Sequence, residues 1–70
     1  MPYSINADLP ERIRHALPPH AQDIYRAAFN SSFASYKNSP RREEIAHRVA
    51  WAAVKKRYMK RDGSWVEREA

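Results

Sequence analysis

The fold is decided by residues 19–38, which read PHAQDIYRAAFNSSFASYKN. Apolar or small side chains recur in this segment at spacings of three and four residues, which is the period of one face of an α-helix. They are Ala21, Ile24, Tyr25, Ala28, Phe29, Ser32, Phe33 and Tyr36. We therefore expect a long amphipathic helix that begins at Pro19 or His20 and runs toward Asn38.

Residues 30–32 decide whether that helix is continuous. Asn30, Ser31 and Ser32 are mediocre helix formers. In one interpretation the helix continues, Ser32 lets a second helix approach closely, and Asn30 and Ser31 face solvent. In the other, a turn at this point divides the segment into a helix-turn-helix unit.

A second long helix is expected after Asn38-Ser39-Pro40 and should continue through Tyr58. Ser39 is a good capping residue, and Pro40 suits the first helical position. The apolar residues fall on two faces, which predicts that this helix is covered on two sides. One face holds Ile45, Val49, Ala52 and Ala53, and the other holds Trp51, Val54 and Tyr58. The short connector predicts an antiparallel hairpin with the preceding helix.

A short helix should come before this pair. Asp8 is a good N-cap, Pro10 suits a first turn, and Leu9, Ile13, Ala16 and Leu17 fall on one face. Pro18 disfavours helical geometry at Leu17, so the helix should end after about two turns. A helix this short depends on tertiary packing.

The two ends of the chain carry weakly alternating segments at residues 3–5 and 64–67, and Asp62-Gly63 is a turn signal. We expect both ends to pack on the helices. Two alternatives stay open for their backbone: each end is simply extended, or the two pair as a small two-stranded β-ribbon. The predicted fold class is mostly α over residues 1–70, as one domain with a short helix and an antiparallel helix pair. Its core should be dominated by Ile24, Phe29, Phe33, Val49, Trp51 and Val54.

The composition narrows the class of protein. There is no cysteine, so disulfides and thiolate zinc sites are excluded. The longest apolar run, residues 49–54, is far shorter than the ~20 residues that span a bilayer. The N-terminus lacks the basic and apolar regions of a secretory leader. These features predict a cytoplasmic protein that does not insert into the membrane.

Catalytic and metal-binding patterns are absent from the sequence. No serine lies in a Gly-x-Ser-x-Gly context, and the single glycine, Gly63, excludes a glycine-rich phosphate loop. We expect no enzyme, no cofactor and no small-molecule substrate. Glu43 and His47 are four residues apart, but two ligands make a poor metal site. We expect Glu43 to support His47 electrostatically, or His47 to pack near Trp51.

The charge balance raises the expectation of an anionic partner. Thirteen Lys and Arg residues against eight Asp and Glu residues leave a net charge of +5. The densest run is residues 55–61, where cations either complement the negative end of a helix or form a binding patch. The candidate partner-binding residues are Arg41, Arg42, Arg48, Lys55, Lys56, Arg57 and Lys60. The aromatic residues at helical spacing are assigned to the core, whereas the positions of Tyr3 and Trp65 stay open.

The chain resembles the ChaB family along nearly its whole length. The matching segments, in order, are Met1-Pro2-Tyr3, Asp8-Leu9-Pro10, Leu17-Pro18, His20-Ala21-Gln22, Ile24-Tyr25, Ala28-Phe29-Asn30-Ser31, residues 46–55, Tyr58 and Trp65. The resemblance implies three helices with a small sheet. It also implies a regulator of the cation/proton antiporter ChaA, so a protein partner at the inner membrane. Enterobacterial members tend to have a longer, acid-rich connector where this chain has residues 37–42.

Three functional hypotheses follow. The first is a regulatory protein that contacts an antiporter. The second is a nucleic-acid-associated protein that binds phosphate through the basic end of the third helix. The third is an assembly module whose dimerisation completes a thin core.

Overall fold

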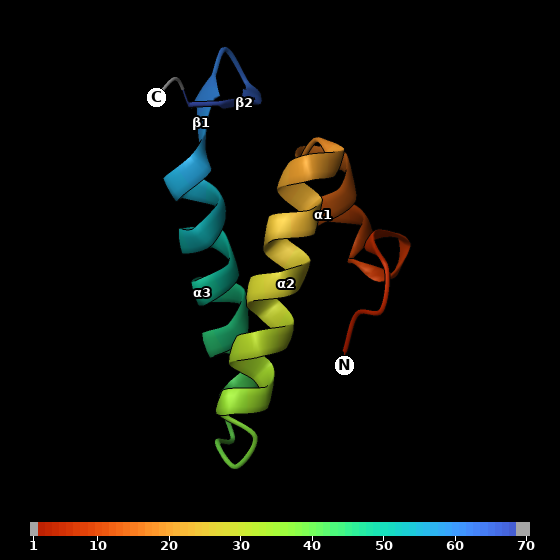
Figure 1. Ribbon diagram of the computed structural model, residues 1–70, viewed down its shortest axis with the longest axis vertical. Helices are drawn as coiled ribbons and strands as arrows, with labels where there is room; N and C mark the ends of the chain where they lie inside the picture. The colour runs from red at the N-terminus through yellow and green to blue at the C-terminus, as the bar shows by residue number, and fades with distance from the viewer. Residues whose placement is uncertain (1, 69–70) are drawn as a thin grey trace.

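A computed structural model describes residues 2–68, so Met1 of the first family motif lies outside the described part (Figure 1). The chain begins with a 3₁₀ turn, η1, followed by three α-helices and a two-stranded antiparallel sheet. Their bounds are η1 Asn6–Asp8, α1 Glu11–Ala16, α2 Pro19–Ser35, α3 Arg42–Arg57, β1 Tyr58–Arg61 and β2 Ser64–Glu67. The predicted mostly α-helical class with a small β-ribbon is confirmed.

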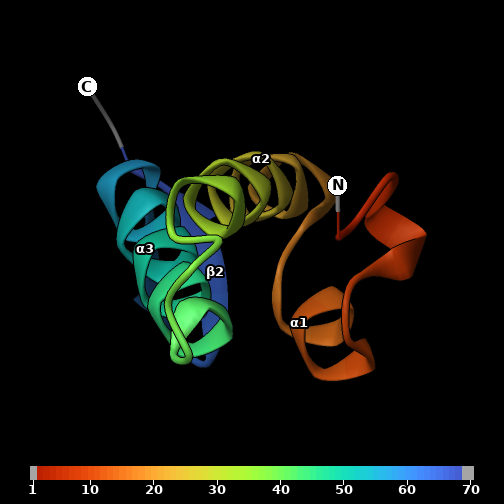
Figure 2. The ribbon, with the colours of Figure 1, turned by 90° about the horizontal axis from the view of Figure 1, so that it is seen from below.

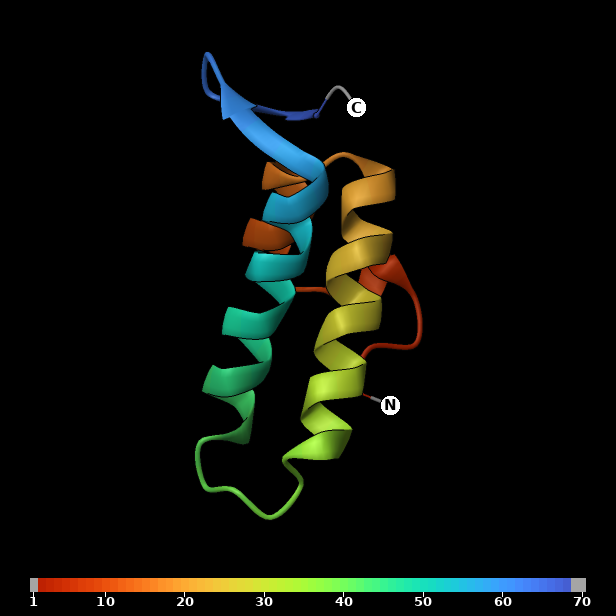
Figure 3. The same ribbon diagram turned by 60° about the vertical axis from the view of Figure 1, so that its left-hand side comes forward.

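Helices α2 and α3 form the antiparallel hairpin that the short connector predicts (Figure 3). Helix α1 lies on one side of this pair and contacts α2 (Figure 2). Helix α2 ends at Ser35, three residues before the expected Asn38, because Tyr36 already leaves helical geometry. Helix α3 begins at Arg42 and not at Pro40, because residues 39–42 form a separate turn in which the Arg42 N–H donates to the Ser39 carbonyl at 3.2 Å.

Helix α2 is continuous through residues 30–32, so the helix-turn-helix interpretation is wrong. Ser32 faces α3 with only 6% of its surface exposed, as expected for a small contact residue. Asn30, expected in solvent, is half-buried instead. Its amide accepts the Tyr3 N–H at 3.2 Å and donates to the Tyr3 carbonyl at 2.8 Å. Asn30 therefore ties the N-terminal segment to the middle of α2.

The start of α1 differs from the prediction. Asp8 does not cap this helix, because it belongs to η1, where its carboxylate accepts the Ile5 N–H at 3.4 Å. Pro10 precedes the first helical residue, and the helix ends at Ala16, one residue before extended Leu17. The Gln22 side chain then donates to the carbonyls of Arg14 and Leu17 at 3.2 and 2.8 Å. These bonds satisfy carbonyls that a helix end otherwise leaves without partners.

The β-ribbon is local and does not join the two ends of the chain. Strand β1 pairs with β2 in antiparallel register, from Tyr58 opposite Glu67 to Arg61 opposite Ser64. Asp62 and Gly63 form the two-residue turn with φ of 51° and 82°, the left-handed geometry that tight hairpins require. The predicted pairing with residues 3–5 is wrong, because Asn30 engages the Tyr3 backbone. Helix α3 also ends at Arg57, since Tyr58 is extended and opens β1.

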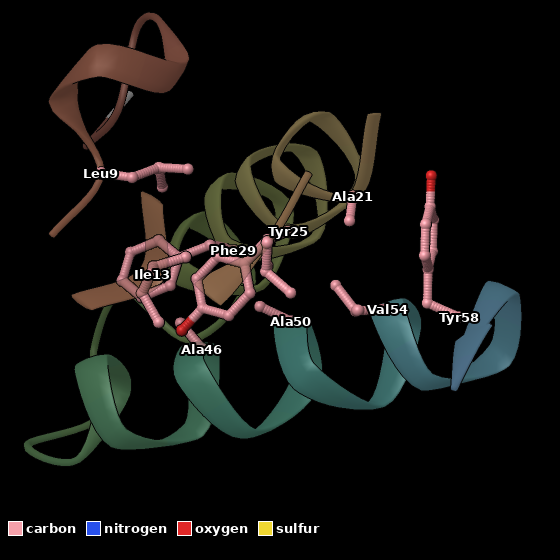
Figure 4. Close-up of a cluster of buried hydrophobic side chains, with 10 residues drawn as sticks. Leu9, Ile13, Ala21, Tyr25, Phe29, Ala46, Ala50, Val54 and Tyr58 are labelled. Carbon is pink, nitrogen blue, oxygen red and sulfur yellow. The ribbon is translucent and has the colours of Figure 1, made fainter. Parts of the chain in front are cut away.

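The core lies between α1, α2 and the inner face of α3 (Figure 4). Its members are Leu9, Ile13, Leu17, Ala21, Tyr25, Phe29, Ala46, Ala50, Val54 and Tyr58. Of the six residues predicted to dominate it, Phe29 and Val54 are buried, and Ile24, Phe33 and Trp51 pack at its edge. Val49 is 40% exposed, so its assignment to the core is wrong. The reason is that α3 turns the small residues Ala46 and Ala50 toward α2.

Candidate partner-binding surface

The last turn of α3 and the first strand gather five exposed cations, which we call the basic end: Lys55, Lys56, Arg57, Lys60 and Arg61. No acidic residue lies between positions 55 and 61. Within residues 2–68, none of the five takes part in a salt bridge. The negative end of the helix dipole favours cations in this turn. Their charge therefore stays available to an anionic partner.

Arg68 adds a sixth cation that sequence reasoning did not single out. Its guanidinium Nε donates to the Lys55 carbonyl at 2.8 Å, and its backbone N–H donates to the Arg57 carbonyl at 2.7 Å. Both carbonyls belong to the last turn of α3, where intrahelical donors run out. The turn at Asp62-Gly63 is the feature of the sequence that could have indicated this position of Arg68, because a two-residue hairpin there brings Arg57 opposite Arg68.

Of the remaining candidate arginines, Arg41 and Arg42 lie at the start of α3, and Arg48 lies in its middle, about two turns before Lys55. The Arg41 guanidinium donates to both Glu44 carboxylate oxygens at 2.9 and 3.0 Å, and Arg48 lies 3.7 Å from the same carboxylate. The hydrogen bonds from Arg41 lower the pKa of Glu44. Since the Glu44 charge offsets part of theirs, these arginines offer a weaker anion site than the basic end.

Arg42 has a structural role. Its guanidinium lies 3.6 Å above the centre of the Phe33 ring and donates to the Phe33 carbonyl at 2.8 Å. A cation over an aromatic face is favourable, and the hydrogen bond satisfies a carbonyl of the last turn of α2. Arg42 therefore joins α3 to the end of α2.

His47 acts as a hydrogen-bond partner within the helix pair. Its Nδ1 is hydrogen-bonded to the hydroxyl of buried Tyr25, and its Nε2 lies 4.0 Å from the Glu43 carboxylate. Burial lowers the pKa of His47, and the Glu43 charge partly opposes this effect. Burial also raises the pKa of Tyr25 to about 12. The expectation that Glu43 supports His47 fits this geometry, and residues 2–68 contain no cluster of three or more potential metal ligands.

A second tyrosine–histidine contact holds the ribbon on the helices. The Tyr58 hydroxyl lies 3.3 Å from His20 Nδ1, and the Glu67 carboxylate lies 3.9 Å from the same atom. Tyr58 is buried in the core, whereas His20 is exposed in the first turn of α2. The contact therefore fixes the direction in which β1 and its cations leave α3.

The aromatic residues divide between the core and the ribbon contact. Tyr3, left unplaced by the sequence, packs on Phe29 with ring centres 4.8 Å apart. Trp65 packs on Trp51 at 5.6 Å and so anchors β2 against α3. Tyr36, assigned to the core from its spacing, is 47% exposed because it follows the last turn of α2.

Comparisons with known proteins show which proteins the chain is similar to. The sequence model of the ChaB family matches residues 9–68. Relatives named "Putative cation transport regulator ChaB" from Escherichia coli and Shigella flexneri are each 54% identical, over 89% of this chain and 90% of theirs. The solution NMR structure of a protein with that name is 51% identical, with a TM-score of 0.84, over 97% of this chain and 100% of that one.

No helix formed by residues 2–68 combines the length and the apolar character needed to cross a membrane. The matched family region contains all three α-helices, both strands and every cation of the basic end. The chain belongs to the ChaB family.

Proposed function

We propose that this protein is a non-enzymatic regulator of cation transport that acts by binding a partner protein in the cytoplasm. The proposed partner is a cation/proton antiporter of the ChaA type, which would hold the regulator at the inner membrane. The relatives named as cation transport regulators support the regulatory part of the proposal. The basic end carries the proposal for the contact, because it exposes five cations that no salt bridge within residues 2–68 neutralises.

The chemistry of this surface defines what the partner must offer. Exposed ion pairs are each worth less than ~1 kcal/mol, so no single cation of the basic end holds a partner. Together, five like charges steer an acidic surface into contact and raise the association rate. The antiporter should therefore present an acidic cytoplasmic segment. Positively charged segments are common next to the membrane, so this acidic segment should be a loop or tail away from it.

Binding to the purified antiporter in lipid nanodiscs tests the proposal. We expect Lys56→Glu to weaken binding about tenfold, because it removes one cation and adds repulsion at the rim of the contact. Lys37→Glu is the matched control, since Lys37 is also exposed but lies in the connector between α2 and α3. Equal losses for both variants, or no binding by the unaltered chain, would contradict the proposal.

The same acid-free run of cations supports nucleic-acid binding as a second candidate function. If five phosphates were contacted, affinity for a DNA duplex would fall about 500-fold between about 50 and 200 mM salt. Binding with this salt dependence would favour nucleic acid as the partner if the double variant Lys55→Glu/Lys56→Glu abolished it. Absence of binding at both salt concentrations would remove this candidate.

A further inference from the structure

A groove lies between the end of α1 and the β-ribbon, next to the basic end. Helix α1 and strand β2 lie on the same side of α2 (Figure 2), and residues of α1 and of both strands line the groove. Its volume is about 370 Å³. It is lined by His15, Ala16, Leu17, Pro18, Lys60, Gly63, Ser64 and Trp65.

Part of the groove is apolar and rests on the core. Leu17 is buried in the core, and Trp65 is half-buried. The Trp65 ring rests on Trp51, which in turn forms a T-shaped pair with Tyr25, with ring centres 5.3 Å apart. Tryptophan in a supported apolar pocket is the residue type that most often dominates the energy of a protein interface. The groove therefore offers an anchoring point for one apolar side chain.

The rim of the groove carries one cation, Lys60. Lys60 pairs with Trp65 across the ribbon, so both side chains project from the same face of the sheet. His15 lies on the opposite wall, and none of the lining residues is acidic. Lys60 also belongs to the basic end, which makes the groove continuous with that surface. A half-buried tryptophan beside a lysine that is continuous with the basic end is complementary to an apolar side chain flanked by carboxylates.

We propose that this groove binds an acidic peptide segment of the partner through one large apolar side chain inserted against Trp65. Carboxylates on either side of that anchor pair with Lys60 and the neighbouring cations of the basic end. This inference rests on the proposed function, because it uses the same surface, and it adds the apolar element that the partner must carry. The groove volume is at the small end of the ~300–1,000 Å³ found for ligand sites, which suits a single side chain.

The favoured occupant is a peptide because of how Trp65 is held. One side of its ring is occupied by Trp51, and Pro18 and Ala16 line the same groove. Single-stranded nucleic acid needs open aromatic faces on which successive bases can stack. A shallow groove beside one lysine, in which Trp51 already occupies one side of the Trp65 ring, accommodates a leucine or phenylalanine side chain better than a run of bases.

Tryptophan fluorescence of the full chain tests the proposal directly. The chain has two tryptophans, Trp51 and Trp65, and they are in contact, so their emission reports on the groove. The probes are two synthetic peptides of glutamates around one central residue, which is leucine in one and alanine in the other. We expect the leucine peptide to bind about tenfold tighter or more, since it buries about three additional carbon atoms. Only this peptide should shift the emission.

Variants separate the anchor from the charge. Ala16→Gln narrows the groove from an exposed position and should abolish the preference for leucine while leaving the alanine peptide unaffected. Lys60→Glu should weaken the binding of both peptides. Lys37→Glu, in the connector between α2 and α3, should change the affinity for either peptide much less. Retained folding of each variant is checked by circular dichroism.

The outcomes distinguish this inference from the proposed function. Equal binding of the two peptides would overturn the groove as an anchor site and leave the basic end as the contact. Binding of neither peptide would also overturn the groove, and the antiporter measurement would then decide the proposed function separately. An emission shift with a short single-stranded DNA, but with neither peptide, would assign the surface to nucleic acid.

Discussion

Enlarging Ala50 tests which face of α3 meets α2. Ala50 is fully buried and, with Ala46 and Val54, forms the buried line of α3 residues (Figure 4). Ala50→Leu adds three carbon atoms to an interface that the small side chain keeps close. Extra methylene groups in a packed core typically cost ~1–3 kcal/mol, because neighbours must shift or leave their preferred rotamers.

The expected loss in the free energy of unfolding is a large fraction of the total stability of the chain, so it can be measured. At roughly 0.05–0.15 kcal/mol per residue, a chain of 70 residues is stabilised by about 4–10 kcal/mol. For domains of this size, each 1 kcal/mol lowers the melting temperature by roughly 4–8 °C. We therefore expect Ala50→Leu to melt about 5–20 °C below the unaltered chain.

Ala52→Leu is the matched control, because it makes the same change two residues away at an exposed position. It should alter the free energy of unfolding by no more than about 0.5 kcal/mol. Thermal and urea unfolding followed by far-ultraviolet circular dichroism measure both variants. A larger loss for Ala52→Leu than for Ala50→Leu would refute the packing described, since the sequence pattern placed Ala52 on a covered face.

Three further predictions concern contacts that hold the surface in place. The native pKa of His47 lies below its ordinary value, so stability should be full above about pH 6.5 and decline as the pH falls below it. The free energy of unfolding, measured from about pH 7.5 to 5.5, should show this decline, and His47→Gln should make it shallower. An unchanged slope in that variant would mean that other titratable groups cause the decline. Arg68→Ala should speed amide hydrogen exchange in the last turn of α3, because Lys55 loses its side-chain donor; unchanged exchange there would contradict this. Asn30→Ala removes two hydrogen bonds to the N-terminal segment and should cost ~1–3 kcal/mol by urea unfolding, whereas a loss below about 0.5 kcal/mol would show that water replaces them.

The helix pair could be predicted from the sequence because its signals are local. The recurrence of apolar residues from Ala21 to Phe33 marks α2, and Pro18 and Pro40 mark nearby helix boundaries. The rotation of α3 could not be predicted in the same way. Its bulky residues suggested that Val49 and Trp51 face the core, but close approach to α2 selected Ala46 and Ala50. Side-chain size alone does not reveal how closely two helices pack.

The candidate surface was predicted in part. The run of cations at residues 55–61 is visible in the sequence, and the structure leaves all five of them exposed. Arg41 and Arg48 differ from this group because both pair with Glu44. Spacings of three and four residues on a helix make these pairs possible. The groove beside Trp65 depends on where the ribbon folds back. Asp62-Gly63 marks that turn in the sequence, but no local pattern specifies that the ribbon then lies beside the end of α1.

The most direct test of the central claim is to map, residue by residue, where the antiporter touches the chain. The isotopically labelled full chain is titrated with the antiporter in nanodiscs, and the loss of each backbone amide NMR signal is followed. Binding through the basic end predicts early signal loss at residues 55–61 and at Trp65, with the connector between α2 and α3 affected last. Signal loss centred on the first turn of α3, or spectra unchanged by the antiporter, would contradict the account.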